Sequence, residues 1–470
     1  MIARSSVVFS VDRTSGVPVF QQVYEALRER ISAGLLASGT RLPPTRSLAV
    51  ELGVSRSTIV TAYEQLVAEG YVEGRQGSGY SVCEMGDVEL VSQPSLATQS
   101  KAVPALSGPR PFSPGVPDMR HFPYRQWARC VARVARNEPE ALITPGADFG
   151  DLRLRQAICE HISLWRGVRA APEQVLITAG SGDALEICVR ALAKPGQSVG
   201  LEDPGYPQIR NFVSSLGMRA HWLPVGADGA ELPPSSGAKV PSIVVLTPTQ
   251  QYPLGGAMAP GRRLEFLNWA ELAKAWVIED DYDSEFRYAG RPIPALASFG
   301  TSSRTIYTGS FSKIFSNNLR LGYLVLPETL IETFTRTLQR FGGKASIMPQ
   351  RPLAVFFEDG EFYRHLRRVR RIYAERRRIL IDLLRTALGP DARIEDPQAG
   401  MQFVLRLPDH CDDRALSKIA EGQGLSVSAL SSFYAVHAPR KGLVLGFCGF
   451  SAEELEGGVA ALAPLVQRAL

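Results

Sequence analysis

The fold of this 470-residue chain is decided by one stretch, Thr308-Gly309-Ser310-Phe311-Ser312-Lys313-Ile314-Phe315-Ser316-Asn317-Asn318-Leu319-Arg320-Leu321-Gly322-Tyr323, with apolar, strand-like runs on both sides. Lys313 follows two small hydroxyl residues, Ser310 and Ser312, and lies seven positions before Arg320. A lysine that forms a Schiff base with an aldehyde cofactor needs partial desolvation, so that its amine is neutral and nucleophilic. The two serines and the arginine would then hold the phosphate of the cofactor. The alternative is a lysine on an ordinary turn between strands, and this stretch alone leaves both interpretations open.

A second segment favours the cofactor interpretation. It reads Trp276-Val277-Ile278-Glu279-Asp280-Asp281-Tyr282-Asp283-Ser284-Glu285-Phe286, a buried strand that ends in a cluster of carboxylates and one tyrosine. Open α/β sheets bind ligands at the carboxyl ends of their strands. A carboxylate at that place can pair with a pyridinium nitrogen and keep the ring an electron sink.

A third segment lies upstream and contains a strand, a Gly180-Ser181-Gly182 turn and the start of a helix. Such a turn offers backbone N–H groups to a phosphate. Taken together in their order along the chain, the three segments resemble the fold-type-I aminotransferases that use pyridoxal 5′-phosphate (PLP). The resemblance covers about residues 111–470 and implies that PLP is the cofactor.

Composition is that of an ordinary globular protein, with 45% hydrophobic and 21% charged residues, and the length allows two to four domains. The net charge of +5 permits an acidic partner without demanding one. No apolar run reaches membrane-spanning length, and the six cysteines are scattered without a C-x-x-C pair. We therefore expect a cytoplasmic protein with reduced thiols, and no metal site.

The N-terminal residues predict a helix-turn-helix. Residues 18–34 form an amphipathic helix, and a short helix spans 45–52. Ser55 can cap the next helix, so that two helices are joined by a tight turn. Residues 71–82 read as a hairpin, or wing, with a Gly-Ser-Gly tip that can approach a phosphate backbone closely.

A small helical interaction module is the alternative for this region. Residues 39–49, 52–58 and the glycine-rich wing, however, resemble the winged-helix domain of the GntR regulators. The resemblance implies that DNA is contacted by Arg46, Arg56, Ser57, Thr58 and Gly77. Arg75 is an additional candidate, for steering of phosphates rather than for reading bases.

The chain is therefore divided into a winged helix-turn-helix at 1–82, a linker at 83–110 and an aminotransferase-like domain at 111–470. In the last part apolar strands alternate with helical stretches, which predicts a doubly wound α/β sheet followed by a small C-terminal α+β lobe. Residues 364–378 carry eight arginines. The helical spacing of their apolar neighbours favours a solvated helix that joins the two lobes over a nucleic-acid patch.

A GntR winged helix joined to a fold-type-I domain resembles the MocR-type transcriptional regulators. This resemblance implies that Lys313 is the aldimine lysine, that Asp280 pairs with the pyridine nitrogen, that Tyr282 binds the ring hydroxyl and that Tyr206 stacks on the ring. Residues around the phosphate would be Ser181, Gly182, Ser310, Ser312 and Arg320. The loop 247–255, which contains Gln251, would border the ring. The family forms homodimers with sites at the subunit interface, and a dimer suits repeated half-sites on an operator.

Two positions depart from the family pattern. Pro145 stands where a tyrosine is usual, so a phosphate contact from the partner subunit is in doubt. Val444 stands near the place of the carboxylate-binding arginine of many aminotransferases, and Arg440 is more simply an exposed loop residue. Ordinary transamination of α-amino acids is therefore not expected.

Two functions remain open from the sequence. One is a PLP-dependent, DNA-binding transcriptional regulator that senses PLP or an amine through Lys313. The other is a working aminotransferase with an attached DNA-binding domain. Candidate effectors by resemblance are an ω-amino acid, taurine, an ectoine-derived amine or PLP itself.

Overall fold

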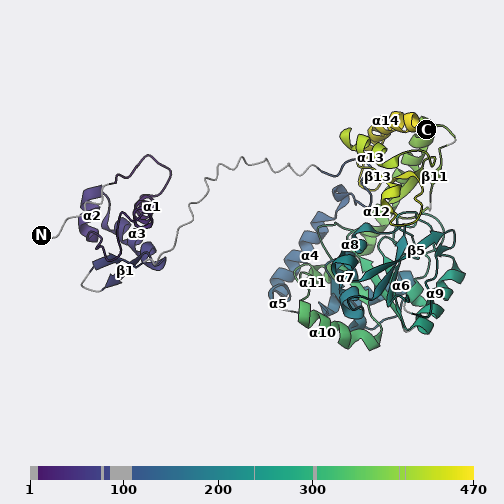
Figure 1. Cartoon of the computed structure of the whole chain (residues 1–470), viewed down its shortest axis with the longest axis horizontal. Coiled ribbons are helices and arrows are strands. Elements are labelled where there is room, and N and C mark those ends of the chain that lie inside the picture. The colour runs from purple at the N-terminus through teal and green to yellow at the C-terminus, as the bar shows by residue number, and fades with distance from the viewer. Residues whose placement is uncertain are drawn as a thin grey trace. The chain divides into compact units, whose positions relative to one another are not determined.

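The computed structural model describes residues 9–75, 79–84, 108–144, 146–237, 239–299, 304–390, 392–396 and 398–470. It divides into two compact units, Met1–Ala105 and Leu106–Leu470 (Figure 1).

The first unit is a winged helix-turn-helix, as predicted. Its elements are α1 (Val19–Ser32), α2 (Thr45–Leu52), α3 (Arg56–Ala68) and the antiparallel strands β1 (Val72–Arg75) and β2 (Gly79–Val82). Val23, Leu27 and Ile59 lie in one apolar core that the three helices share. Gly53 takes the left-handed conformation (φ 64°) that ends α2 and turns the chain into α3.

The second unit is built on an eight-stranded sheet in the order β3-β10-β9-β8-β7-β4-β5-β6. Strands β4, β7, β8, β9 and β5 run parallel to their neighbours in this series, whereas β10 is antiparallel to both β3 and β9. The strands are β3 (Val175–Thr178), β4 (Ser198–Asp203), β5 (Arg219–Gly226), β6 (Gly229–Ala230), β7 (Ile243–Leu246), β8 (Trp276–Asp281), β9 (Thr305–Ser310) and β10 (Gly322–Val325). This arrangement confirms the predicted doubly wound α/β fold.

Alternate residues of the strands enter different apolar clusters, because successive side chains of a strand point to opposite faces. Leu176 and Leu324 join one cluster, and Ile177 and Tyr323 join another. The first cluster includes residues of α7 (Ser181–Leu192), α8 (Pro207–Ser215) and α10 (Ile331–Phe341). The second includes residues of α4 (Tyr124–Asn137), α6 (Leu152–Arg166), α11 (Gln350–Glu358) and α12 (Glu361–Leu388). Helix α9 (Pro260–Ala273) packs over β7 and β8, and the short helices are η1 (Met119–His121), α5 (Glu140–Ile143), η2 (Pro172–Gln174), η3 (Leu296–Ser298), η4 (Glu328–Leu330) and η5 (Leu430–Phe433).

Helix α12 leads from the large part of this unit into the small C-terminal lobe (Figure 1). The lobe holds a four-stranded antiparallel sheet in the order β11-β12-β14-β13 with α13 (Asp413–Gly422) and α14 (Ala452–Ala469). Its strands are β11 (Ile394–Glu395), β12 (Gln402–Arg406), β13 (Ser428–Ala429) and β14 (Gly442–Gly446). Within the arginine run, Arg376 is buried and its Nη2 lies 2.7 Å from Asp118 Oδ2, so this arginine serves packing inside the unit rather than a solvated face.

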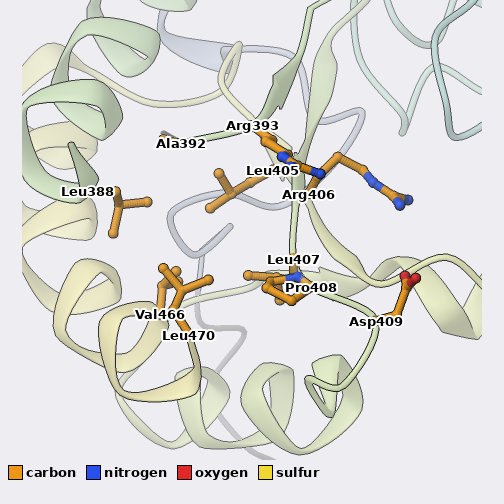
Figure 2. A pocket seen from close by; sticks show the side chains of 10 residues that line it. All are labelled: Leu388, Ala392, Arg393, Leu405, Arg406, Leu407, Pro408, Asp409, Val466 and Leu470. Carbon is orange, nitrogen blue, oxygen red and sulfur yellow. The ribbon is translucent and has the colours of Figure 1, made fainter. Parts of the chain in front are cut away.

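A cavity of about 400 Å³ lies within the small lobe. Figure 2 shows the side chains of Leu388, Leu405 and Val466 around it, whereas the Arg406 side chain extends away from them. None of the residues that the sequence singled out lines this cavity. In the described part of the chain, every helix is too short or too polar to cross a membrane.

Candidate functional site

A second cavity of the larger unit gathers residues from distant parts of the chain. Strands β8 and β9 are parallel neighbours, and Asp280 pairs in register with Thr308, so the segments that follow these strands lie together at one edge of the sheet. Helix α7 begins at that edge with Ser181, and the small lobe contributes β12. The cavity is lined by Pro114, Gly115, Ser181, Tyr206, Tyr252, Asp280, Tyr282, Asp283, Lys313, Met401 and Gln402.

Lys313 projects into this cavity from the turn after β9. Its Nζ donates a hydrogen bond to the carbonyl oxygen of Gly115 at 2.8 Å. Burial lowers the pKa of the amine, although the nearby carboxylates of Asp283 and Asp280 oppose this shift. The lysine is thus closer to a neutral nucleophile than a surface lysine is.

Asp280 is the carboxylate of the cavity that lacks a partner. Its Oδ1 is buried and makes no hydrogen bond within the described residues. Burial raises the pKa of Asp280 to about 7, with additional contributions from Asp281 and Glu202, while Lys313 opposes the shift. An unpaired buried carboxyl group is costly unless a donor arrives. A protonated pyridine nitrogen is such a donor.

The carboxylates that flank Asp280 on β8 are satisfied within the protein. Asp281 Oδ2 accepts hydrogen bonds from Arg166 Nε at 2.7 Å and from the Tyr307 hydroxyl at 2.5 Å. Glu279 accepts the backbone N–H groups of Leu296 and Ala297, each at 2.9 Å. Among these carboxylates at the end of the strand, Asp280 is therefore the one that is available to a ligand.

The predicted phosphate-binding residues surround the start of α7. Gly180 precedes this helix with φ 97°, and a Cβ built on it would lie 3.9 Å from Ser312 Oγ, so the two segments meet here. Ser310 Oγ accepts a hydrogen bond from the Ser312 N–H at 3.2 Å. Arg320 is exposed, takes a left-handed conformation (φ 47°), and its side chain makes no hydrogen bond or ion pair within the described residues. A helix N-terminus, two hydroxyls and an uncommitted arginine suit a phosphate.

Gly182 is the second residue of α7, and a Cβ added to it would touch nothing within 4 Å. The backbone at this turn is therefore open to the approach of a ligand. Of the predicted phosphate residues, Ser181 lines the cavity itself, while Gly182, Ser310, Ser312 and Arg320 lie on the segments beside it.

Three tyrosines form an aromatic wall. Tyr252 packs edge-on against Tyr206 and Tyr282, with ring centroids 5.8 and 5.6 Å apart. The Tyr282 hydroxyl donates to the carbonyl oxygen of Gln250 at 3.2 Å. Gln251 does not line the cavity, because its amide nitrogen donates to the backbone carbonyls of Pro204 and Tyr252 at 2.8 and 2.7 Å. Its side chain holds the loop in place.

Several lining residues were missed by the sequence reasoning. Tyr252 lies in the loop 247–255 next to Gln251, and Asp283 lies in the acidic cluster that follows β8. Gln402 gave no signal, since β12 is far downstream. Its Nε2 is buried without a hydrogen-bond partner among the described residues, and its amide lies close enough to Tyr252 to oppose the burial that raises the pKa of that tyrosine to about 12.

Val444 is fully buried beside this wall. It packs in an apolar cluster with Val404, Leu430 and Phe433, and the Phe433 ring lies edge-on to Tyr252 at 5.5 Å. The place expected for a carboxylate-binding arginine is therefore apolar. Pro145, the other departure from the family pattern, lies outside the described residues.

The predicted DNA contacts in the helix-turn-helix lie at the starts of α2 and α3, with Arg46 in the first turn of α2 and Arg56, Ser57 and Thr58 in the first turn of α3. Arg46, Arg56 and Ser57 are exposed, and Thr58 is half-buried. Ser55 Oγ accepts a hydrogen bond from the Thr58 N–H at 3.1 Å and so caps α3. Arg75 ends β1, exposed, with Nη2 3.3 Å from Glu73 Oε1. Gly77 lies outside the described residues.

Comparisons with known proteins assign a family to each of two stretches of the chain. Residues 20–82 match the family described as "Bacterial regulatory proteins, gntR family", and residues 119–462 match "Aminotransferase class I and II". The "Probable rhizopine catabolism regulatory protein MocR" of Rhizobium meliloti is 39% identical over 466 residues, which cover 96% of this chain and 94% of the relative. The "HTH-type pyridoxine biosynthesis transcriptional regulator PdxR" of Corynebacterium glutamicum is 32% identical and covers 99% of each chain.

Solved structures resemble the larger unit. The α-aminoadipate aminotransferase LysN from Thermus thermophilus, complexed with N-(5'-phosphopyridoxyl)-L-leucine, has a TM-score of 0.68 and 26% identity, and covers 77% of this chain and 93% of that one. The kynurenine aminotransferase of Pyrococcus horikoshii has a TM-score of 0.71 at 23% identity, with 78% and 92% of the two chains covered, which shows a shared fold.

Proposed function

The chain belongs to the MocR-type family of PLP-dependent, DNA-binding transcriptional regulators, and on this premise we propose that an amine, or PLP itself, controls its binding to an operator through the Lys313 cavity. The observation that carries the proposal is that Lys313 and Asp280 line the same cavity, and that Asp280 Oδ1 has no hydrogen-bond partner within the described residues. A buried acid that lacks a donor and a lysine with a lowered pKa together form a receptor for an aldehyde on a pyridine ring.

When PLP is bound, its aldehyde supplies the carbon to which an amine nitrogen can be joined. Lys313 offers the amine, and burial lowers its pKa below that of an exposed lysine. Asp280 would accept a hydrogen bond from the protonated ring nitrogen, Tyr282 would bind the ring hydroxyl and Tyr206 would pack on the ring face. Ser181, Gly182, Ser310, Ser312 and Arg320 surround the phosphate.

The domain serves as a sensor rather than as an enzyme with sustained turnover. Turnover of an α-amino acid requires that its carboxylate be held firmly while the α-proton is removed, and poor orientation removes orders of magnitude in rate. Val444 leaves the expected carboxylate position apolar and fully buried. An ω-amino acid, taurine, an ectoine-derived amine and PLP itself are the candidate effectors, and the pyridoxine biosynthesis role of one relative adds support for the last.

DNA is bound through the start of α3 and through the wing. Arg46 and Arg56 take phosphates or guanine edges from the exposed turn, Ser57 and Thr58 contact the backbone, and Arg75 with Gly77 approaches DNA from the wing. A cytoplasmic homodimer would present two such units to repeated half-sites.

The proposal is tested by titrating operator DNA with the protein in its PLP-free, PLP-bound and amine-treated forms. Lys313→Ala should remove the covalent link to PLP that borohydride reduction otherwise makes permanent, while operator binding remains. Deletion of residues 1–85 should abolish the gel shift. The regulator reading fails if neither PLP nor any amine changes DNA affinity while keto-acid product forms at enzyme-like rates.

A further inference from the structure

The cavity contains a second carboxyl group to which the cofactor assigns no partner. Asp283 follows Tyr282, is 2% exposed and lines the cavity together with Lys313, Met401 and Gln402. Asp280 is taken by the ring nitrogen in the proposed site, whereas Asp283 lies beside the small lobe, because a Cβ built on Gly400 would come within 2.9 Å of its Oδ2.

The cavity has little positive charge to balance Asp283. Lys313 is the single cationic side chain among the described residues that line it. Arg210, on the neighbouring helix α8, is not part of the lining, and its Nη2 donates to the carbonyl oxygen of Ser432 at 3.3 Å. Arg376 is bound to Asp118 and to the carbonyl of Cys448.

The side chains that pack behind Tyr252 in the small lobe are apolar. Val404, Leu430, Phe433 and Val444 form a closed cluster against Tyr252, so no cation can approach from that direction without breaking the core of the small lobe. Gln402 Nε2 makes no hydrogen bond within the described residues, although its amide lies near Tyr252, and as a neutral donor it suits a hydroxyl or carbonyl oxygen of a ligand.

These features decide what an incoming amine can carry. Burial, together with the nearby charges of Asp281 and Glu285, raises the pKa of Asp283, and Lys313 opposes that shift. A ligand carboxylate placed beside Asp283 would compete with it for the same cation. Lys313 can balance only one of two ionised carboxylates, so the other must either take up a proton or stay buried without a counter-charge, and both outcomes cost binding free energy that a ligand without a carboxylate does not lose.

We propose that Asp283 determines ligand specificity, and that the site selects primary amines with no carboxylate on the carbon that bears the nitrogen. This rests on the proposed function, since it assumes that the ligand amine meets PLP at Lys313. It narrows the effector to amines whose neighbouring substituents are neutral, with Gln402 available to hydrogen-bond a hydroxyl group.

The test compares matched ligand pairs that differ by one carboxylate: isopentylamine with L-leucine, and phenethylamine with L-phenylalanine. Binding to the PLP-loaded full-length protein is measured by calorimetry and by the absorbance of the cofactor. We expect each amine to bind at least about tenfold more tightly than its amino acid, the size expected for a like charge nearby at an intermediate effective dielectric. Equal or tighter binding of the amino acids would overturn the proposal.

Two variants assign the effect to its residue. Asp283→Asn should reduce the amine-to-amino-acid ratio by about tenfold. Glu279→Gln is the matched control, because Glu279 is also buried on this segment but accepts the backbone N–H groups of Leu296 and Ala297, outside the cavity lining, and it should leave the ratio unchanged. A ratio that Asp283→Asn leaves unaltered removes Asp283 from the proposal. Absence of any PLP link to Lys313 in the wild-type protein would instead reject the proposed function.

Discussion

Replacing Asp280 by asparagine removes the carboxylate that is proposed to bind the ring nitrogen of the cofactor. Burial raises the pKa of this carboxyl group to about 7, so its ionised form costs about 4 kcal/mol more than that of an exposed aspartate. This cost is offset when the ring nitrogen donates a charge-assisted hydrogen bond to Oδ1, which contributes about 1.5–3 kcal/mol net. Asp280→Asn keeps the shape but loses that bond, so the Kd for PLP should rise about 10- to 150-fold.

The pH dependence gives a second, independent reading of the same residue. Because the pKa of Asp280 is raised to about 7, the carboxyl group of the cofactor-free protein is mostly protonated below that pH. PLP must find it ionised, so affinity in the wild-type protein should fall as the pH drops from about 8 to about 6. Lys313 contributes in the same direction, since its amine gains a proton as the pH falls. Asp280→Asn should keep only the lysine part of this slope.

The assay is an equilibrium titration of cofactor-free protein with PLP, followed by absorbance at several pH values. Glu279→Gln is the matched control, because burial raises the pKa of Glu279 to about 7 as well, yet both its oxygens are occupied by backbone N–H groups. The control should change the Kd by less than about threefold, as it removes no ligand contact. Equal affinity and an equal pH slope for Asp280→Asn and the wild type would refute the assignment.

Three further outcomes are expected. Lys313→Ala should bind PLP reversibly without a borohydride-stable link, as mass spectrometry would show, while its melting temperature stays near that of the wild type. Arg56→Ala should cost about 1–3 kcal/mol in operator binding and relax specificity at one position of each half-site, whereas Arg75→Ala should weaken binding to all sequences and reduce the salt slope by about 1, both measured by fluorescence titration. Ser55→Ala should lower the free energy of unfolding of the winged-helix unit by about 1 kcal/mol in thermal melts, because the Ser55 side chain caps the Thr58 N–H. Ser57→Ala should leave that free energy unchanged.

The sequence identifies the fold and much of the site because those residues lie in short motifs at strand ends. Lys313 follows β9 and Asp280 is the last residue but one of β8, and parallel pairing of these strands brings such positions together whatever the surrounding detail. The winged helix is predictable for a similar reason, since its caps and apolar spacing are local. Local signals of this kind can be read from the sequence without knowledge of the tertiary structure.

What the sequence could not give depends on side-chain direction and on distant segments. Gln251 lies in a recognisable loop, but its amide turns onto the carbonyls of Pro204 and Tyr252, and Tyr252 reaches the cavity instead. Gln402 lies in β12 of the small lobe, and no local sequence pattern predicts that this strand reaches the cavity. Arg376 looks like one of many solvated arginines until α12 packs it against Asp118.

The small lobe both lines the cavity and is hydrogen-bonded to the central sheet. Met401 and Gln402 of the lobe line the cavity, and Asp203 at the end of β4 accepts the backbone N–H groups of Ala435, Val436 and His437 at 2.6, 3.1 and 3.0 Å. The lobe is thus hydrogen-bonded to the end of β4 and also lines the cavity, and we expect a ligand that favours one arrangement of the lobe to shift the population towards it. The shift cannot exceed the ligand's difference in affinity between the two positions, and by linkage DNA must change ligand affinity by the same factor. An amine that binds equally with and without operator therefore cannot be the effector, however tightly it binds.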